Sequence, residues 1–352
     1  MHLNKILQNA VQKKATDIFI MSGLALAFRI NTEIAYTEGK PLNPIEVEKL
    51  VGELYSNTIK KNVGELRKIG DDNFSFTIHN MGWFRANVAL HKGVLGAVIR
   101  VLPSFVPQYK EINIPENIMQ TTLPQKGLAL VVGAAGSGKT TTLACIIDKI
   151  NSESAKHIIT IEDPIEHLHE HKKSIVTQRE IGVDIDSYEN GIKAALRQSP
   201  DVILIGEMRS AETMSVAMSA AETGQLVFST LHTSSAASAV DRIINSFSAD
   251  KQQQVRFQLS MVLQAVISQQ LIPGINEEVV PAFEVLLVTP AVRHMIRDGK
   301  THQIDSIIFS GRRSGMQTMD SNILSLYEEG KISLDNAIQY SSNPNEIIQK
   351  IA

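Results

Sequence analysis

Residues 133–140 read Gly-Ala-Ala-Gly-Ser-Gly-Lys-Thr and match the phosphate-binding loop pattern G-x-x-x-x-G-K-[ST]. The apolar run 128–132 before the octet predicts a buried strand, and the run 141–147 after it predicts the start of a helix. A strand, a glycine-rich loop and a helix, in that order, are the context that the pattern requires. The octet therefore predicts an α/β domain that binds the phosphates of a nucleotide.

The residue types of the loop suit ATP and Mg²⁺ as ligands. Glycines let backbone N–H groups curl around phosphate oxygens without a Cβ clash, and a helix N-terminus adds a partial positive charge. Lys139 is expected to reach the β- and γ-phosphates, and the Thr140 hydroxyl is expected to bind Mg²⁺. The residues expected to line the phosphates are Gly133, Ala134, Ala135, Gly136, Ser137, Gly138, Lys139, Thr140 and Thr141.

The length, composition and charge of the chain predict a soluble cytoplasmic protein. The chain has 352 residues, which suggests two domains, and no apolar stretch approaches the roughly 20 residues that a membrane span needs. Its start shows no signal-peptide pattern. Cys145 is the single cysteine, which excludes an internal disulfide and a cysteine-based zinc cluster. The net charge of −3 gives no overall attraction to nucleic acid, so we expect neither nucleic-acid binding nor membrane insertion.

Periodicity and punctuation divide the chain into four expected parts. Residues 1–103 predict a small α+β domain, with helices near 3–14 and 44–55. Prolines and weak periodicity predict a linker at 104–115. Residues 116–289 alternate strands and helices, as in a mostly parallel sheet, and residues 290–352 predict a helical region. The strands expected in the first part are 17–20, 28–30, 73–78, 84–90 and 96–101.

Three predicted strands of the second domain end in acidic residues or histidine. Because ligands of open parallel sheets bind at the carboxyl ends of strands, we expect these residues to gather around the phosphates. Carboxylates there can orient or deprotonate an attacking water, and a histidine can sense the γ-phosphate by hydrogen bonding. The candidate residues are Glu162, Asp163 and Glu166 after 158–161, Glu207 after 202–205, and His232 after 226–228.

Two of these strand ends leave alternatives open. In the usual second nucleotide motif an aspartate directly ends the strand, but here Gly206 occupies that place. Glu207 is therefore expected to serve the metal through water, the attacking water, or both. Glu162 or Asp163 could instead cap a helix after Pro164.

Several separate motifs resemble one family. Residues 196–209 resemble the signature of the type II secretion and type IV pilus motor ATPases, and 162–166 and 223–233 resemble their acidic and histidine boxes. Residues 290–300 and 315–320 are similar to C-terminal motifs of the pilus retraction ATPases, the PilT type. The likeness runs over essentially the whole chain, so the chain is identified by resemblance as a type IV pilus retraction ATPase.

The resemblance implies a homohexameric ring of RecA-like P-loop ATPase domains, each carrying a PAS-like N-terminal domain that closes over the nucleotide. It implies an ATP hydrolase at the inner face of the cytoplasmic membrane. The motor would dock on an inner-membrane platform protein and power pilus disassembly and twitching motility. A paralogous retraction ATPase is a further candidate partner.

The resemblance also points to arginines of the N-terminal domain, Arg85 and Arg100, as groups that a neighbouring subunit supplies. An arginine in that role is worth roughly 10³–10⁵ in rate. The alternative is that both are solvated charges at strand edges. Arg179 and Arg209 are candidates of second rank.

Three positions depart from the family pattern. Ser210 stands in place of the signature's final aspartate, Gln225 in place of the first histidine of the histidine box, and Phe19 in place of a histidine near the start. We expect the first two to lie near the chemistry. They keep one alternative open, a nucleotide-gated accessory subunit that hydrolyses ATP weakly.

A pilus extension or secretion ATPase of the same superfamily is the other alternative. Those relatives generally carry a zinc insertion built on paired cysteines, which one cysteine cannot form. A DNA-translocating ring is disfavoured by the neutral composition.

Overall fold

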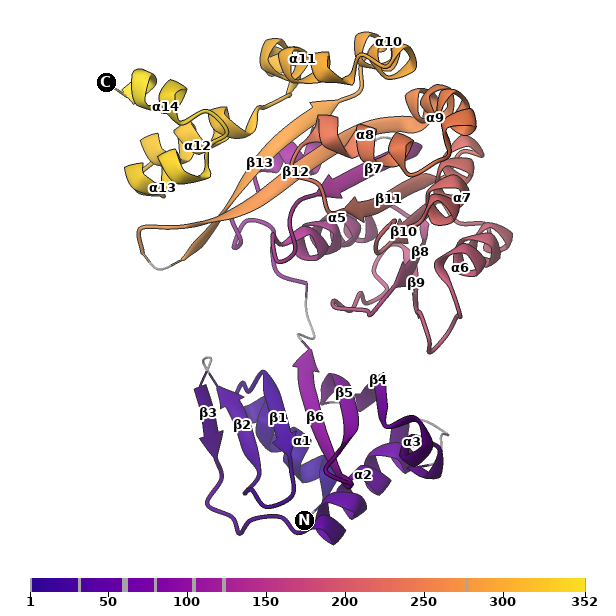
Figure 1. Ribbon diagram of the computed structural model, residues 1–352, viewed down its shortest axis with the longest axis vertical. Helices are drawn as coiled ribbons and strands as arrows, with labels where there is room; N and C mark the ends of the chain where they lie inside the picture. The colour runs from indigo at the N-terminus through magenta and orange to yellow at the C-terminus, as the bar shows by residue number, and fades with distance from the viewer. Residues whose placement is uncertain are drawn as a thin grey trace. The chain divides into compact units, whose positions relative to one another are not determined.

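The structure is a computed structural model that describes residues 2–30, 33–58, 63–78, 81–102, 106–121, 125–276 and 278–351. The chain splits into two compact units, one of residues 1–105 with 166–168 and one of 106–165 with 169–352. We call them the N-terminal and C-terminal units and describe each by itself (Figure 1). Among the described residues, no helix combines the length and apolar character needed to cross a bilayer.

The described part of the N-terminal unit contains a six-stranded antiparallel sheet with the order β3-β2-β1-β6-β5-β4. Its buried face packs against helices through residues such as Ile18, Phe28 and Ile99, all at most 1% exposed. The strands are β1 (Asp17–Ile20), β2 (Ala27–Ile30), β3 (Glu33–Tyr36), β4 (Asp71–Ile78), β5 (Gly82–His91) and β6 (Val94–Leu102). The helices are α1 (Leu3–Gln12), α2 (Pro44–Thr58) and α3 (Val63–Ile69).

Local sequence signals explain most of these elements. Asn43 and Glu46 form a reciprocal cap at the start of α2, in which each backbone N–H donates to the other side chain, at 2.8 and 2.9 Å. The edge strand β3 was not predicted. It is exposed along its whole length, so it lacks the alternation of apolar and polar residues that marks a half-buried strand.

The C-terminal unit is built on a sheet with the order β13-β12-β7-β11-β10-β8-β9. All neighbouring pairs are parallel except β12 with β13, which is antiparallel. The central strands are buried on both faces and are therefore continuous apolar runs. The strands are β7 (Gly127–Val132), β8 (His157–Glu162), β9 (Ile175–Glu180), β10 (Val202–Ile205), β11 (Leu226–Leu231), β12 (Leu263–Pro273) and β13 (Val279–Leu287).

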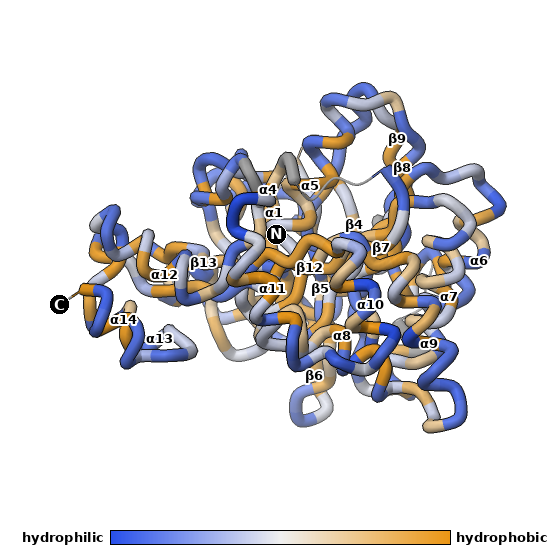
Figure 2. The backbone as a smooth tube through the Cα atoms, turned by 90° about the horizontal axis from the view of Figure 1, so that it is seen from above, coloured by the Kyte–Doolittle hydropathy of each residue, from blue (hydrophilic) through white to orange (hydrophobic). Residues whose placement is uncertain are grey.

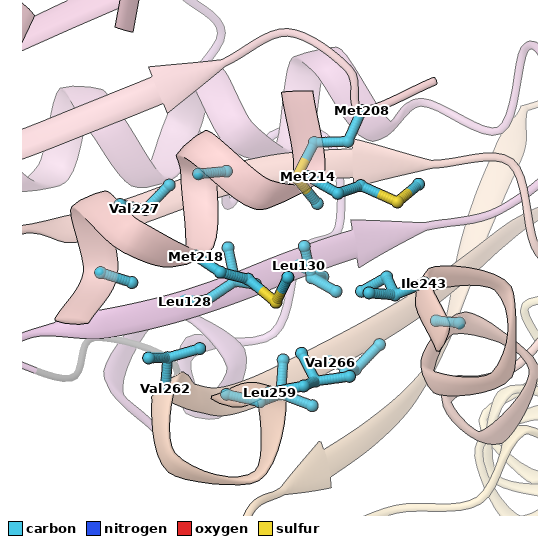
Figure 3. Packing of buried hydrophobic residues seen from close by; sticks show 14 of the residues in the cluster. Leu128, Leu130, Met208, Met214, Met218, Val227, Ile243, Leu259, Val262 and Val266 are labelled. Atoms are coloured by element: carbon cyan, nitrogen blue, oxygen red, sulfur yellow. The ribbon is translucent and has the colours of Figure 1, made fainter. Parts of the chain in front are cut away.

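Helices cover both faces of this sheet. Alternate residues of β7 divide between the two sides, since Leu128 and Leu130 belong to one buried cluster and Ala129 and Val131 to the other. The first cluster includes Met214 of α7 together with Leu130, and both are labelled in Figure 3. Its helices are α6 (Tyr188–Ala195), α7 (Ala211–Glu222), α8 (Ala236–Asn245), α9 (Ala249–Val262), α10 (Pro290–Asp298) and α11 (Ile304–Ser310), and the second face carries α4 (Glu116–Thr121) and α5 (Lys139–Glu153).

The stretch expected to be a linker packs on the C-terminal unit instead. Ile114 is 3% exposed in the cluster of α5, and Val106, Tyr109 and Ile112 are partly buried against it. The prolines do interrupt regular structure here, but apolar residues spaced along the turns still bury themselves. Positions 103–105 of the expected boundary lie outside the described residues.

The predicted helical region after residue 289 is present. Helices α12 (Met319–Glu328), α13 (Leu334–Tyr340) and α14 (Pro344–Ile351) form a cluster of their own with Ile272, Val280 and Ala282 of the β12–β13 hairpin. Hydrophobic and hydrophilic residues alternate along these helices, as Figure 2 shows. A cavity of about 860 Å³ lies between this cluster, α11, the hairpin and the loop after β7.

Glu284 on β13 is a buried carboxylate at the wall of this cavity. Its side chain accepts a hydrogen bond of 2.8 Å from the backbone N–H of Ala236 at the start of α8. Burial, with smaller effects from the carboxylates of Asp305 and Asp320, raises the pKa of Glu284 to about 6. The charged form is therefore less favourable in the fold than in the unfolded chain.

Replacing Glu284 by glutamine is expected to remove a pH-dependent loss of stability. The folded protein holds this proton to higher pH than the unfolded chain, so the wild-type free energy of unfolding falls as pH rises from 4.5 to about 6. Glutamine keeps an acceptor for Ala236 without the charge. Guanidinium unfolding at about pH 4.5 and about pH 7.5 measures the effect. From the lower to the higher pH, the free energy of unfolding of the variant should rise by roughly 2 kcal/mol relative to that of wild type. An equal difference at both pH values would contradict the raised pKa.

Candidate functional site

The loop between β7 and α5 has the backbone geometry of a phosphate cradle. Gly138 is the N-cap of α5, and its left-handed backbone (φ 82°) turns the chain into the helix. At Gly133 (φ 155°) a Cβ would lie 2.3 Å from the carbonyl oxygen of Gln269 and 2.5 Å from Ser137 Oγ. Glycine is therefore required at both positions for conformational or steric reasons. The predicted strand and helix around the octet are confirmed.

Lys139 and Ser137 carry buried polar groups inside this loop. The Lys139 ammonium donates to the carbonyl oxygens of Gly133 and Ala134, at 2.9 and 2.7 Å, and the residue is 7% exposed. The Ser137 hydroxyl is buried and finds no hydrogen-bond partner among the described residues. Because buried polar groups in native proteins are normally paired, an anion with several oxygens suits this loop. Thr140 and Thr141 follow in the first turn of α5, both partly exposed.

Parallel pairing brings four strand ends to one edge of the sheet. The loop follows β7, His232 follows β11, Glu207 follows β10, and Glu162 ends β8, and these strands are neighbours in that order. With a strand spacing of about 4.8 Å, Glu207 lies on the second strand from the loop, about 10 Å away along the edge.

Glu207 is held between two basic side chains. Oε1 lies 2.7 Å from Arg209 Nη2 and Oε2 lies 3.4 Å from His232 Nε2, while the Glu207 side chain is 13% exposed. The Thr230 hydroxyl donates to the carbonyl of Gly206 at 2.7 Å, and the Met208 N–H donates to the carbonyl of Thr230 at 3.2 Å. These bonds tie the ends of β10 and β11 together. The predicted proximity of Glu207 and His232 is therefore present.

The acidic residues after β8 differ in their surroundings. Glu162 is 5% exposed and accepts hydrogen bonds from Thr160 Oγ1 at 2.6 Å and Gln178 Nε2 at 3.2 Å. Asp163 and Glu166 are exposed. Glu166 belongs, with residues 167–168, to the N-terminal unit.

The alternative of a helix cap at this position is wrong. No helix lies between β8 and β9 in this fully described stretch, so neither Glu162 nor Asp163 caps one after Pro164. The second-rank Arg179 on β9 donates to the carbonyl of Asp184 at 3.0 Å. Arg209, by contrast, contacts Glu207 directly.

Tyr188 is a member of this neighbourhood that the sequence did not reveal. It begins α6, and its hydroxyl is buried against Gly206, where an added Cβ would lie 3.0 Å from the tyrosine oxygen. Burial, followed by the charges of Glu207, Asp163 and Glu162, raises the pKa of Tyr188. The only sequence signal was Gly206 itself, because a glycine in place of the motif's aspartate indicates space taken by another group.

The departures at Ser210 and Gln225 have different outcomes. Ser210 caps α7, accepting from Thr213 N at 3.1 Å, and its hydroxyl donates to Glu189 Oε1 at 3.2 Å. It therefore fills the capping role that an aspartate serves at a helix N-terminus. Gln225 precedes β11, at the opposite end of that strand from His232 and about 20 Å from it. The expectation that Gln225 lies near the chemistry is wrong within this chain.

The arginine candidates form a row across the N-terminal sheet. Asp17 pairs in register with Arg29 and Arg100, and Arg100 pairs with Arg85, so all four face the same side. Asp17 Oδ1 accepts from Arg100 Nε at 3.0 Å and Oδ2 lies 3.3 Å from Arg29 Nε. Arg85 donates to Asn73 at 3.2 Å. Two arginines, Arg29 and Arg100, share the Asp17 carboxylate, and the Arg100 side chain is 64% exposed. Arg29 was not among the predicted residues.

Comparisons with known proteins cover nearly the whole chain. The chain is 39% identical over 344 residues to the type IV pilus retractation ATPase PilT of Pseudomonas aeruginosa, covering 98% of this chain and 99% of that protein. It is 37% identical over 350 residues to the type IV pilus ATPase PilU of the same organism, covering 99% and 90%. The crystal structure of the pilus retraction motor PilT with bound ADP superposes with a TM-score of 0.89 and 40% identity, over 99% of each chain.

The structural likeness confirms the predicted α/β fold class. A family model described as type II/IV secretion system protein matches residues 1–351. The chain therefore belongs to the type II/IV secretion system protein family.

Proposed function

We propose that this chain is an ATP-hydrolysing motor that powers the retraction of type IV pili and works as a homohexameric ring. The observation that carries the proposal is the meeting of Glu207 and His232 at the sheet edge beside the loop 133–140. The similarity to PilT and PilU along nearly the full chain supports the direction of the motor. Its predicted partners are an inner-membrane platform protein and a paralogous retraction ATPase.

The loop residues bind and orient the triphosphate. Backbone N–H groups of 133–140 at the start of α5 face the phosphate oxygens, and Lys139 exchanges its two carbonyl partners for the β- and γ-phosphates. The Ser137 hydroxyl, buried in this loop, gains a partner in the same step. A bound anion therefore accepts hydrogen bonds from Lys139, which otherwise donates to carbonyl groups of its own loop, and from the Ser137 hydroxyl.

The residues present also fit a magnesium ion. The Thr140 hydroxyl in the first turn of α5 and the Glu207 carboxylate, through water, would hold it, since Mg²⁺ prefers oxygen ligands and retains several waters. Bound Mg²⁺ neutralises charge on the phosphate oxygens.

Glu207 is the group that we assign to the attacking water. It follows β10 directly and is largely buried, and His232 lies 3.4 Å from one of its oxygens, where an imidazole can respond to the γ-phosphate. Arg209 occupies the other oxygen and must release it before Glu207 can take a proton from water. Glu162 and Asp163 on the adjacent strand end add acceptors for the surrounding waters.

The arginine row of the N-terminal sheet supplies positive charge to the reaction. In the ring, we assign Arg85 and Arg100 to the γ-phosphate of a neighbouring subunit. Asp17 accepts a hydrogen bond from Arg100 Nε at 3.0 Å and leaves most of the Arg100 side chain exposed, so the guanidinium is oriented and still accessible.

Lys139→Ala is expected to abolish nucleotide binding or hydrolysis, because the only ammonium of the loop is lost. ATP affinity should fall by about 10- to 100-fold, the effect of losing charge-assisted hydrogen bonds. Titration with a fluorescent ATP analogue and a phosphate-release assay measure both effects. Lys156→Ala, which changes an exposed lysine paired with Asp201, is the matched control and should behave as wild type. Normal turnover in the Lys139 variant would overturn the loop assignment.

Glu207→Gln should bind ATP, assemble and stall, since glutamine keeps the shape but cannot accept the proton. Turnover should fall at least about 100-fold. Cells whose only copy of the gene carries this variant should show excess surface pili and no surface motility. Electron microscopy counts the pili, and stab assays measure the motility. The exposed Glu212→Gln on α7 is the control. Bald cells would indicate an extension motor, and failure to bind ATP would indicate that Glu207 retains the metal.

Arg100→Ala is expected to leave ATP binding intact and to lower turnover, by up to about 10³-fold if it acts as an arginine finger. The assay compares phosphate release by confirmed hexamers of the variant and of Arg67→Ala, an exposed arginine paired with Glu48 on the same unit. Unchanged turnover would remove Arg100 from the mechanism. A wild-type hexamer no faster than Glu207→Gln would instead favour the accessory-subunit alternative.

A further inference from the structure

The Tyr188 hydroxyl is a buried polar group that the fold does not satisfy. Tyr188 is the first residue of α6, after the cap Ser187, whose side chain accepts from Asn190 N. Its oxygen is buried and has no hydrogen-bond partner among the described residues. A hydroxyl in that state destabilises a fold, and the phenylalanine that lacks it would pack equally well. Stability therefore does not account for the tyrosine.

The hydroxyl lies at the carboxyl end of the strand that carries Glu207. A Cβ on Gly206 would stand 3.0 Å from the tyrosine oxygen, 3.4 Å from Glu162 Cα and 3.5 Å from the carbonyl of Ile161. A side chain at 206 would therefore crowd the tyrosine hydroxyl, whereas its contacts with the end of β8 would be of ordinary length. Gly206 and Tyr188 form a complementary pair at the position where the usual motif has an aspartate.

The charged groups that influence this hydroxyl are mainly carboxylates. The carboxylates of Glu207, Asp163 and Glu162 all act on Tyr188, in that order of strength, and Arg209 is the opposing cation. With burial, they keep the phenol protonated, because the phenolate would face negative charge in a poorly solvated place. The tyrosine is thus an O–H donor beside the residues to which we assign the water and its carboxylate.

We propose that Tyr188 is a positioning residue for ATP hydrolysis: once Arg209 releases Glu207, the tyrosine hydroxyl donates a hydrogen bond to water that enters between Glu207 and the carboxylates after β8. The proposal rests on the proposed function. It gives the site a neutral donor beside its carboxylates, which fixes the orientation of that water. Arg209 and His232 contact Glu207 itself, so this donor is separate from both.

Tyr188→Phe tests the proposal, because it removes the oxygen and keeps the ring. In confirmed hexamers, kcat should fall about tenfold, with KM for ATP and ATP affinity unchanged. The melting temperature should stay the same or rise, since an unsatisfied buried hydroxyl is gone. Tyr55→Phe is the matched control: that hydroxyl donates to Asp72 at 3.0 Å in the N-terminal unit, so its loss should lower the melting temperature and leave kcat unchanged.

The outcomes separate this proposal from the proposed function. If wild type hydrolyses ATP and Tyr188→Phe is equally fast, the positioning role of Tyr188 is overturned and the hydrolytic function is not. A variant that loses ATP affinity, or that loses kcat and melting temperature together as in a packing defect, also overturns it. Wild type no faster than Glu207→Gln overturns the hydrolytic function, and this proposal with it.

A second pair of variants tests the geometry. Gly206→Ala should lower the melting temperature of wild type more than that of Tyr188→Phe, because the new Cβ meets the hydroxyl at 3.0 Å only when the oxygen is present. An equal loss in both backgrounds would overturn the placement of the hydroxyl against Gly206.

Discussion

The parallel pairing of β7, β11, β10 and β8 is the constraint on which the site depends. Parallel strands in register end together, so residues as far apart in sequence as Gly133 and His232 reach one edge without any long-range recognition of their own. Glycine in the loop after β7 and the bonds between the ends of β10 and β11 refine that edge. The chemistry of Glu207 and His232 is thus a product of sheet topology.

The same edge shows how the protein handles charge in partly buried places. The charge of Lys139 is stabilised by hydrogen bonds to carbonyl groups of its own loop, that of Glu207 by the ion pair with Arg209, and that of Glu162 by hydrogen bonds from a hydroxyl and an amide. Each of these arrangements is reversible, because the partners are hydrogen-bonding groups that a phosphate or water can replace. Such pairing stabilises the resting state and leaves the groups available to a ligand.

Features that a local sequence pattern encodes could be predicted, and features that depend on packing between distant residues could not. The loop, the buried strands and the strand-end carboxylates followed from an octet and from apolar runs. The edge strand β3, the packed turns near Tyr109 and the role of Tyr188 did not, because exposure, burial and an unpaired hydroxyl carry no periodic signal. The misplacement of Gln225 had a different cause. A motif was treated as one cluster although it spans both ends of a strand.

The contact between Glu189 and the start of α7 has a mechanical consequence. Glu189 accepts hydrogen bonds from Ser210 and Thr213, and the Thr213 bond lowers its pKa, so an ionised carboxylate on α6 clasps the first turn of α7. The short segment 206–209 therefore connects β10 to a helix whose first turn is hydrogen-bonded to α6. A shift of that segment during a catalytic cycle would therefore act on α6 as well as on α7.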